Sequence, residues 1–179
     1  MRPETLAIRT QTERTGEKEH STPLFLTSSF VYDSAEDMAA AFSDDSLDVN
    51  IYSRFSNPSV DEFIKKVCLM EGAEDGIATA SGMAAVNACF MTFLSAGDHV
   101  ISAAAVFGST HAILTKYLPK WGIEYSYFDM NKPETIEALV KSNTKLLYVE
   151  TPSNPGLDII DMEMVAAICK KHNIIFGHQ

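Results

Sequence analysis

The chain has 179 residues, 46% apolar and 21% charged, which is an ordinary composition for a globular protein. Its formal net charge of −10 argues against a nucleic-acid surface, because neutralising phosphates requires clustered Lys and Arg. Residues 1–20 are charged and lack the apolar stretch of a secretory leader, and the most apolar run, residues 83–94, is too short to span a bilayer. We therefore expect a cytoplasmic protein with no nucleic-acid or membrane partner.

The cysteines and histidines indicate neither disulfides nor a metal centre. Cys68, Cys89 and Cys169 are far apart in the sequence and lie in apolar helical patterns, as expected of buried reduced thiols. The five histidines show no metal-ligand spacing. We therefore expect no metal site.

Residues 1–57 show little regular pattern, and we expect them to form an extended N-terminal arm. A helix is predicted near residues 34–42, with Ser34 as its N-cap and Asp37 close to the exposed amides of the first turn. The acidic stretch that follows, residues 43–48, is typical of a loop.

From residue 58 onward the pattern predicts alternating helices and strands. A first helix ends at Gly72, and later helices start near Ser81, Ser109, Pro133 and Asp161, with Asn131 and Glu134 as a capping pair. Such alternation is typical of an α/β fold with a mostly parallel sheet covered by helices on both faces. The predicted strands are residues 76–79, 99–103, 123–128, 145–149 and 173–176.

One motif, Ser81-Gly82-Met83, follows a predicted strand and opens a helix. The first amides of a helix have no intrahelical partner and lie at its positive end, so they suit a phosphate. Gly82 has no side chain to keep an anion from the backbone. Taken alone, an ordinary Ser-capped turn that binds nothing explains the motif better.

Tyr52-Ser53-Arg54 precedes Asn57-Pro58. A Tyr and an Arg two residues apart in an extended segment point to the same side, and together they offer a phenol and a forked guanidinium to a phosphate. Taken alone, an ordinary exposed pair without a ligand explains this motif better.

Two further segments follow predicted strands. Residues 150–155, Glu-Thr-Pro-Ser-Asn-Pro, lie beyond the strand at 145–149, where ligands of open α/β sheets bind. A proline-rich turn from strand to helix that binds nothing is the alternative. Phe107, just beyond the strand at 99–103, is either a core residue or a flat platform for an aromatic ligand.

The order and spacing of these motifs together are far more specific than any one of them. Along nearly its whole length the chain resembles the Cys/Met-metabolism family of pyridoxal-phosphate (PLP) enzymes, and within it most closely the O-succinylhomoserine and O-acetylhomoserine sulfhydrylases. The resemblance implies the large PLP-binding domain of a fold-type I enzyme. It is carried by residues 20–24 and 27–30, Tyr52-Ser53-Arg54, Asn57-Pro58, residues 69–74, Ser81-Gly82-Met83-Ala84, residues 150–155 and His172-Asn173.

The resemblance also assigns roles to residues. It implies that the amides of Gly82 and Met83 hold the coenzyme phosphate and that Tyr52 and Arg54 reach the same phosphate from a neighbouring subunit. Phe107 would stack on the pyridine ring, and Asn154 would contact the 3′-oxygen. A homo-oligomer, dimer or tetramer, is implied as well.

The implied reaction is γ-replacement on an O-acylated homoserine by sulfide or a thiol, in methionine and cysteine biosynthesis. Phe107 favours a sulfhydrylase, because most lyases and cystathionine synthases of the family have Tyr there. Ser109 differs from the Cys of the methionine γ-lyase pattern. A cystathionine γ-synthase or γ-lyase remains the alternative within the family.

Parts of the family pattern fall outside the chain. The resemblance implies that the lysine that binds the coenzyme covalently and the C-terminal domain would lie beyond residue 179. The family's Asp that pairs with the pyridine nitrogen would fall just after the last predicted strand, residues 173–176, where this chain reads Gly177-His178-Gln179. We therefore expect an N-terminal fragment: an arm over residues 1–57 and, over residues 58–179, an incomplete half of the PLP-binding domain. Alone it would contain no catalytic residue and be inactive, or it would serve as a non-catalytic, subunit-like partner.

Overall fold

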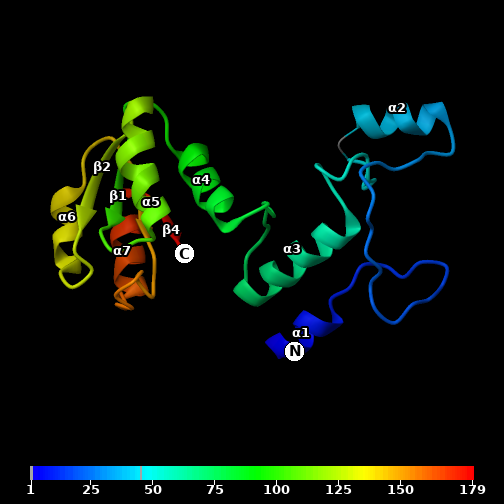
Figure 1. Ribbon diagram of the computed structural model, residues 1–179, viewed down its shortest axis with the longest axis horizontal. Helices are drawn as coiled ribbons and strands as arrows, with labels where there is room; N and C mark the ends of the chain where they lie inside the picture. The colour runs from blue at the N-terminus through cyan, green and yellow to red at the C-terminus, as the bar shows by residue number, and fades with distance from the viewer. Residues whose placement is uncertain (1, 45) are drawn as a thin grey trace. The chain divides into compact units, whose positions relative to one another are not determined.

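The computed structural model describes residues 2–44 and 46–179 (Figure 1). The chain divides into two compact units, of which one ends at Ala78 and the other runs from Thr79 to Gln179.

The described residues of the first unit form the helices α1 (Pro3–Arg9), α2 (Ala35–Ser43) and α3 (Pro58–Glu71). As predicted, Ser34 caps α2, since its Oγ accepts the Asp37 N–H at 3.0 Å. Asn57 caps α3 in the same way by accepting the Ser59 N–H at 3.0 Å. Gly72 ends α3 in the left-handed region, at φ +67°, as the sequence indicated.

A buried carboxylate ties the front of the chain to α3. Glu62 accepts hydrogen bonds from the Thr12 N–H at 2.9 Å, from the Thr22 hydroxyl, and from Lys66 Nζ at 2.7 Å. Burial alone would raise the pKa of Glu62, but these donors outweigh it and lower the pKa to about 2. The residue is therefore ionised over the whole physiological range.

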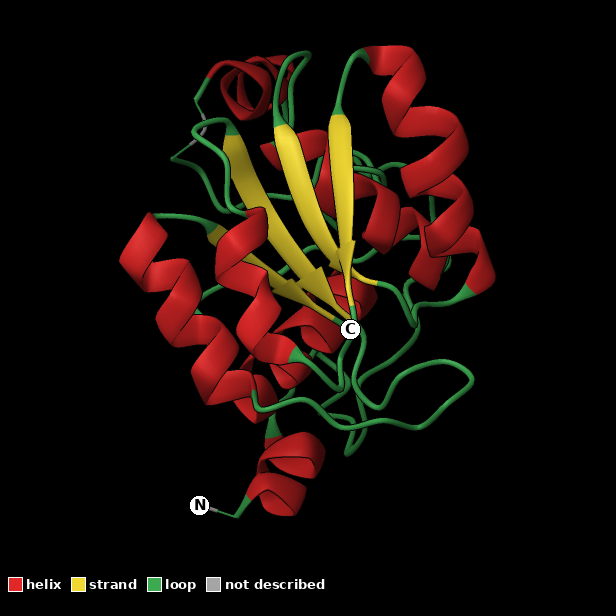
Figure 2. Ribbon diagram, turned by 90° about the vertical axis from the view of Figure 1, so that its left-hand side faces the viewer, coloured by secondary structure: helices red, strands yellow, loops and turns green. Residues whose placement is uncertain are grey.

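The second unit is built on a parallel sheet with strand order β2-β1-β3-β4. Figure 2 shows the strands side by side with their arrows pointing the same way. The strands are β1 (His99–Ala103), β2 (Glu124–Phe128), β3 (Thr144–Val149) and β4 (Ile175–His178). The helical segments are α4 (Gly82–Phe93), α5 (Gly108–Ala112), η1 (Ile113–Tyr117), η2 (Leu118–Trp121), η3 (Pro133–Thr135), α6 (Ile136–Leu139) and α7 (Met162–His172).

The core of this unit lies around the two central strands. Every residue of β1 is buried, and so is every residue of β3 except Lys145. A strand buried at successive positions is covered on both faces, so the predicted α/β architecture is confirmed. Phe90 of α4 contributes a fully buried ring, 5.0 Å from the ring of Tyr148 between centroids.

One predicted strand and one predicted helix cap are wrong. Residues 76–79 form no strand: no strand of the described sheet pairs with them, and Ile77 is 90% exposed. Asn131 and Glu134 form no capping pair either. The Asn131 N–H instead donates to Asp129 Oδ1 at 2.9 Å in a turn, and η3 begins at Pro133 without a side-chain cap.

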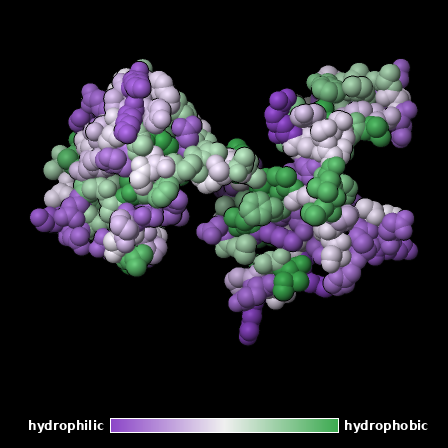
Figure 3. Space-filling model, in the orientation of Figure 1, coloured by the Kyte–Doolittle hydropathy of each residue, from purple (hydrophilic) through white to green (hydrophobic). Residues whose placement is uncertain are grey.

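Part of the surface is apolar. On α3, Val60, Phe63, Leu69 and Met70 are all exposed, and Figure 3 shows apolar surface in this region. Among the helices that the structure describes, none combines the length and apolarity needed to cross a bilayer.

Candidate functional site

The start of α4 exposes two backbone amides. Ser81 caps the helix, since its Oγ accepts the Ala84 N–H at 3.2 Å. Within the described residues, no acceptor is hydrogen-bonded to the amides of Gly82 and Met83. A Cβ added to Gly82 would meet nothing within 4 Å, so the backbone is open to an approaching ligand. The site thus has the two properties of an anion-binding helix start, free donors and free access.

The packing of α4 directs this start toward the carboxyl edge of the sheet. Phe90, late in α4, contacts Tyr148, one residue before the end of β3. The chain then returns through residues 94–98 to His99, where β1 begins. The first turn of α4 therefore lies toward the edge at which the strands end, where ligands of parallel α/β sheets bind.

Phe107 and Asn154 follow β1 and β3 at the same edge. The Phe107 side chain is 42% exposed, so it is a partly open ring and not a core residue. Asn154 is exposed in a turn closed by the Leu157 N–H, which donates to the Ser153 carbonyl at 2.9 Å. Ser153 is buried and bonds Asp158 Oδ2 at 2.9 Å, which fixes the loop from within.

Glu150 makes a contact that the sequence did not indicate. Its carboxylate accepts the Phe107 N–H at 2.7 Å, although the two residues are 43 positions apart. Glu150 is 8% exposed and directly follows β3. The one feature of the sequence that could have pointed to this contact is a charged residue directly after a strand that is predicted to be buried.

Tyr52 and Arg54 lie in the first unit and are close to each other. The Arg54 guanidinium stands over the Tyr52 ring at 5.2 Å and over the Phe55 ring at 5.4 Å. The predicted extended segment is instead a turn, closed by the Phe55 N–H, which donates to the Tyr52 carbonyl at 2.8 Å. The two side chains are therefore paired by stacking and not by strand alternation.

Neighbouring contacts hold this turn. Tyr52 forms an antiparallel bridge with Ser29, and the Ser53 N–H donates to the Ser28 carbonyl at 2.9 Å. The buried Asn57 donates to Ser53 Oγ at 3.0 Å. Tyr52 and Arg54 also line a hollow of about 300 Å³ whose other walls are mainly apolar, including Met38 and Phe42.

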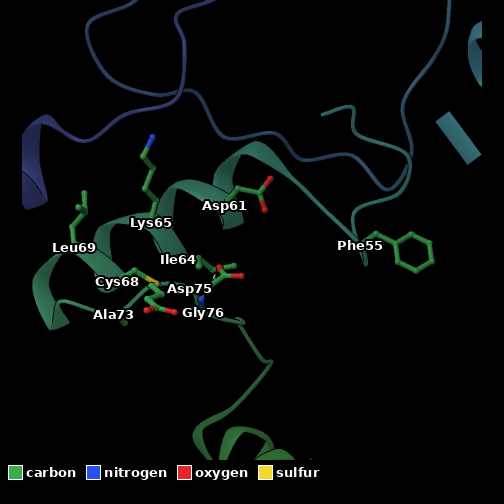
Figure 4. A pocket seen from close by; sticks show the side chains of 10 residues that line it. Phe55, Asp61, Ile64, Lys65, Cys68, Leu69, Ala73, Asp75 and Gly76 are labelled. Atoms are coloured by element: carbon green, nitrogen blue, oxygen red, sulfur yellow. Dashed lines mark hydrogen bonds between the residues drawn. The ribbon is translucent and has the colours of Figure 1, made fainter. Parts of the chain in front are cut away.

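A second hollow of about 440 Å³ lies beside α3 (Figure 4). Its lining includes Ile64, Lys65, Cys68, Leu69 and Gly76, and none of the residues predicted to bind a ligand. The mixture of apolar and charged side chains in an open hollow does not indicate a catalytic site.

At the end of β4, Gln179 takes part in the sheet edge. Its N–H donates to the Val149 carbonyl at 3.0 Å, and its side-chain oxygen accepts the Tyr148 hydroxyl at 2.9 Å. Burial raises the pKa of Tyr148 well above its ordinary value, so this phenol stays protonated.

The chain matches known proteins over most of its length. The family model for Cys/Met metabolism PLP-dependent enzymes matches residues 4–176. An O-succinylhomoserine sulfhydrylase of Pseudomonas aeruginosa is 44% identical over 165 residues, which are 92% of this chain and 41% of that protein. An L-methionine gamma-lyase of Porphyromonas gingivalis is 36% identical over 152 residues, or 85% of this chain and 38% of that protein.

The fold matches as well. The crystal structure of a putative O-acetylhomoserine (thiol)-lyase from Campylobacter jejuni, with a pyridoxyl-lysine monophosphate, superposes with a TM-score of 0.92 at 32% identity. The match covers 100% of this chain and 44% of that one, so the chain spans about two fifths of the length of its relatives. The relatives are trans-sulfuration enzymes, and the coenzyme of the family is pyridoxal 5′-phosphate. The chain belongs to the Cys/Met-metabolism PLP-dependent enzymes.

Proposed function

We propose that this chain supplies the phosphate-binding part of an enzyme that replaces the acyloxy group of an O-acylhomoserine by sulfide or a thiol. The observation that carries the proposal is the open start of α4, where the amides of Gly82 and Met83 lack acceptors among the described residues. The 44% identity to an O-succinylhomoserine sulfhydrylase supports this substrate class.

The residues of this chain fit the coenzyme by their chemistry. Two free amides at the positive end of a 12-residue helix provide donors for a phosphate dianion. Tyr52 and Arg54 add a phenol and a guanidinium, and we propose that they come from a second copy of the chain, as the resemblance implies. Their stacked pairing orders the long Arg side chain before any ligand arrives.

Phe107 and Asn154 would contact the ring of the coenzyme. The partly exposed phenyl offers a flat apolar face for stacking, and the Asn154 amide offers a donor for the 3′-oxygen. The bound coenzyme supplies an electron-withdrawing pyridine ring, which stabilises negative charge at the substrate Cα. The described residues would bind and orient the coenzyme. We propose that a lysine outside them transfers the protons of the reaction.

Phe107 and Ser109 favour replacement over elimination. A phenyl group at position 107 has no hydroxyl with which to assist a proton transfer. Ser109 stands where the methionine γ-lyase pattern has Cys. Phe107 ends the loop after β1 as the N-cap of α5, and Ser109 lies in the first turn of that helix.

The test uses a version of the protein that is extended to the full length of its relatives. This protein is incubated with O-succinylhomoserine and sulfide, and the products are identified. We expect homocysteine as the main product, and Phe107→Tyr serves as the matched variant that adds only a hydroxyl. Release of ammonia and a keto acid without homocysteine would contradict γ-replacement and favour a γ-lyase. Product formed only with cysteine as the thiol would favour a cystathionine γ-synthase.

A further inference from the structure

We propose that Glu150 is a positioning residue that holds Phe107 in place for stacking on the coenzyme. The inference rests on the proposed function, because it takes from it the role of the Phe107 ring. It goes beyond that function because it gives a role to Glu150, a buried residue that is not among those proposed to contact the coenzyme.

The contact itself is short and specific. Glu150 Oε2 accepts the backbone N–H of Phe107 at 2.7 Å, within the range of charge-assisted bonds. Glu150 is 8% exposed while Phe107 is 42% exposed. The carboxylate therefore holds the backbone from the protein interior and leaves the ring open.

The anchor of this contact is rigid. Glu150 directly follows Val149, which pairs with His178 in the ladder between β3 and β4. The next residue, Thr151, donates its N–H to the Gln179 carbonyl at 3.0 Å. A carboxylate fixed at the end of two paired strands defines where Phe107 stands relative to the sheet.

The loop that carries Phe107 is held at both ends. At its start, the Ala104 N–H donates to the Phe128 carbonyl at 3.0 Å, which ties the loop to the end of β2. At its end, Glu150 ties Phe107 to the end of β3. Without Glu150, the hydrogen bond between Ala104 and Phe128 is the one that remains of these two.

The charge of Glu150 suits its position. Phe107 is the N-cap of α5, and it has no side-chain cap of its own. Helix α5 continues into η1 and η2, so the carboxylate lies at the positive end of a helical run from Gly108 to Trp121. An isolated buried carboxylate is unfavourable, and here the helix start and the Phe107 amide compensate for it.

Amide hydrogen exchange of the full 179-residue chain tests the contact without any coenzyme. Glu150→Ala should lower the protection of the Phe107 amide about 10- to 100-fold, as expected for a lost bond to a charged acceptor. Glu150→Gln keeps an acceptor of the same reach and should restore most of the protection. The Ala104 amide should stay protected in both variants, which shows that the sheet is intact. Unchanged protection of Phe107 in Glu150→Ala would overturn the proposal.

Titration of the same variants with pyridoxal 5′-phosphate, followed by its absorbance, tests the consequence. Glu150→Ala should bind the coenzyme about 2- to 10-fold more weakly, the size of a lost aromatic contact. In a Phe107→Ala background it should cause no further loss, because Glu150 acts through Phe107. A further loss there would overturn the positioning role. A wild-type chain that binds no coenzyme would contradict the proposed function, and hydrogen exchange would still decide the Glu150 contact.

Discussion

Glu62 gives the sharpest stability prediction, because its ionised carboxylate ties the front of the chain to α3. Its pKa falls from 4.5 to about 2, since the donors Lys66, Thr22 and Thr12 outweigh the effect of burial. A difference of about 2.5 units, at about 1.36 kcal/mol per unit, corresponds to about 3 kcal/mol in favour of the folded state at neutral pH.

The pH window follows from the direction of this shift. A carboxyl with a lowered pKa in the folded state stabilises fully above its unfolded pKa of 4.5, and the stabilisation is lost as the pH falls toward 2. Glu62→Gln replaces the carboxylate by a neutral group of the same size, so at pH 7 the variant should behave like the protonated wild type.

The assay is hydrogen exchange of the Thr12 amide, which donates to Glu62 at 2.9 Å. At pH 7, Glu62→Gln should lower its protection by about 100-fold, the equivalent of about 3 kcal/mol. At pH 2, where about half of the wild-type Glu62 is protonated, the difference in protection should shrink to about twofold. Glu71→Gln, an exposed position at the end of the same helix, is the matched control and should change nothing. Equal protection of the Thr12 amide in the wild type and in Glu62→Gln at pH 7 would show that the ionised Glu62 does not stabilise this contact.

Three further predictions concern the second unit. Burial lowers the pKa of His99, so protonation opposes folding, and the melting temperature should fall as the pH drops below 6.5; His99→Asn should remove this pH dependence. Ser81→Ala removes the cap of α4 and should lower the free energy of unfolding by about 1 kcal/mol in urea titrations, whereas no change would show that the cap is dispensable. Phe90→Ala removes a fully buried ring packed on Tyr148 and should cost about 3–5 kcal/mol in the same titrations, and a cost below about 1 kcal/mol would contradict the packing described.

The parts of the fold that depend on local chemistry were predictable from the sequence. The helix cap at Ser34 and Asp37 needs only two residues that are three positions apart in the sequence. The strand His99–Ala103 is a short, mainly apolar run, which is buried in the sheet as expected. The open start of α4 was predictable for the same reason, since Ser81-Gly82 specifies a capped helix with bare amides.

What the sequence did not predict depends on distant partners. Residues 76–79 have the composition of a strand, but a strand also needs a neighbour to pair with, and no described strand pairs with them. The turn at Tyr52–Phe55 is fixed by contacts with Ser28 and Ser29, which lie far away in sequence. The Glu150–Phe107 bond joins two loops, and no local pattern encodes it.

The function proposed for this chain depends on the binding of the pyridoxal 5′-phosphate phosphate by the amides of Gly82 and Met83. The direct test is an amide NMR titration of the chain with pyridoxal 5′-phosphate, compared with pyridoxal, which lacks the phosphate. We expect the Gly82 and Met83 resonances to shift with the phosphate ester and to stay in place with pyridoxal. Resonances of these two residues that respond to neither compound, or to both alike, would contradict it.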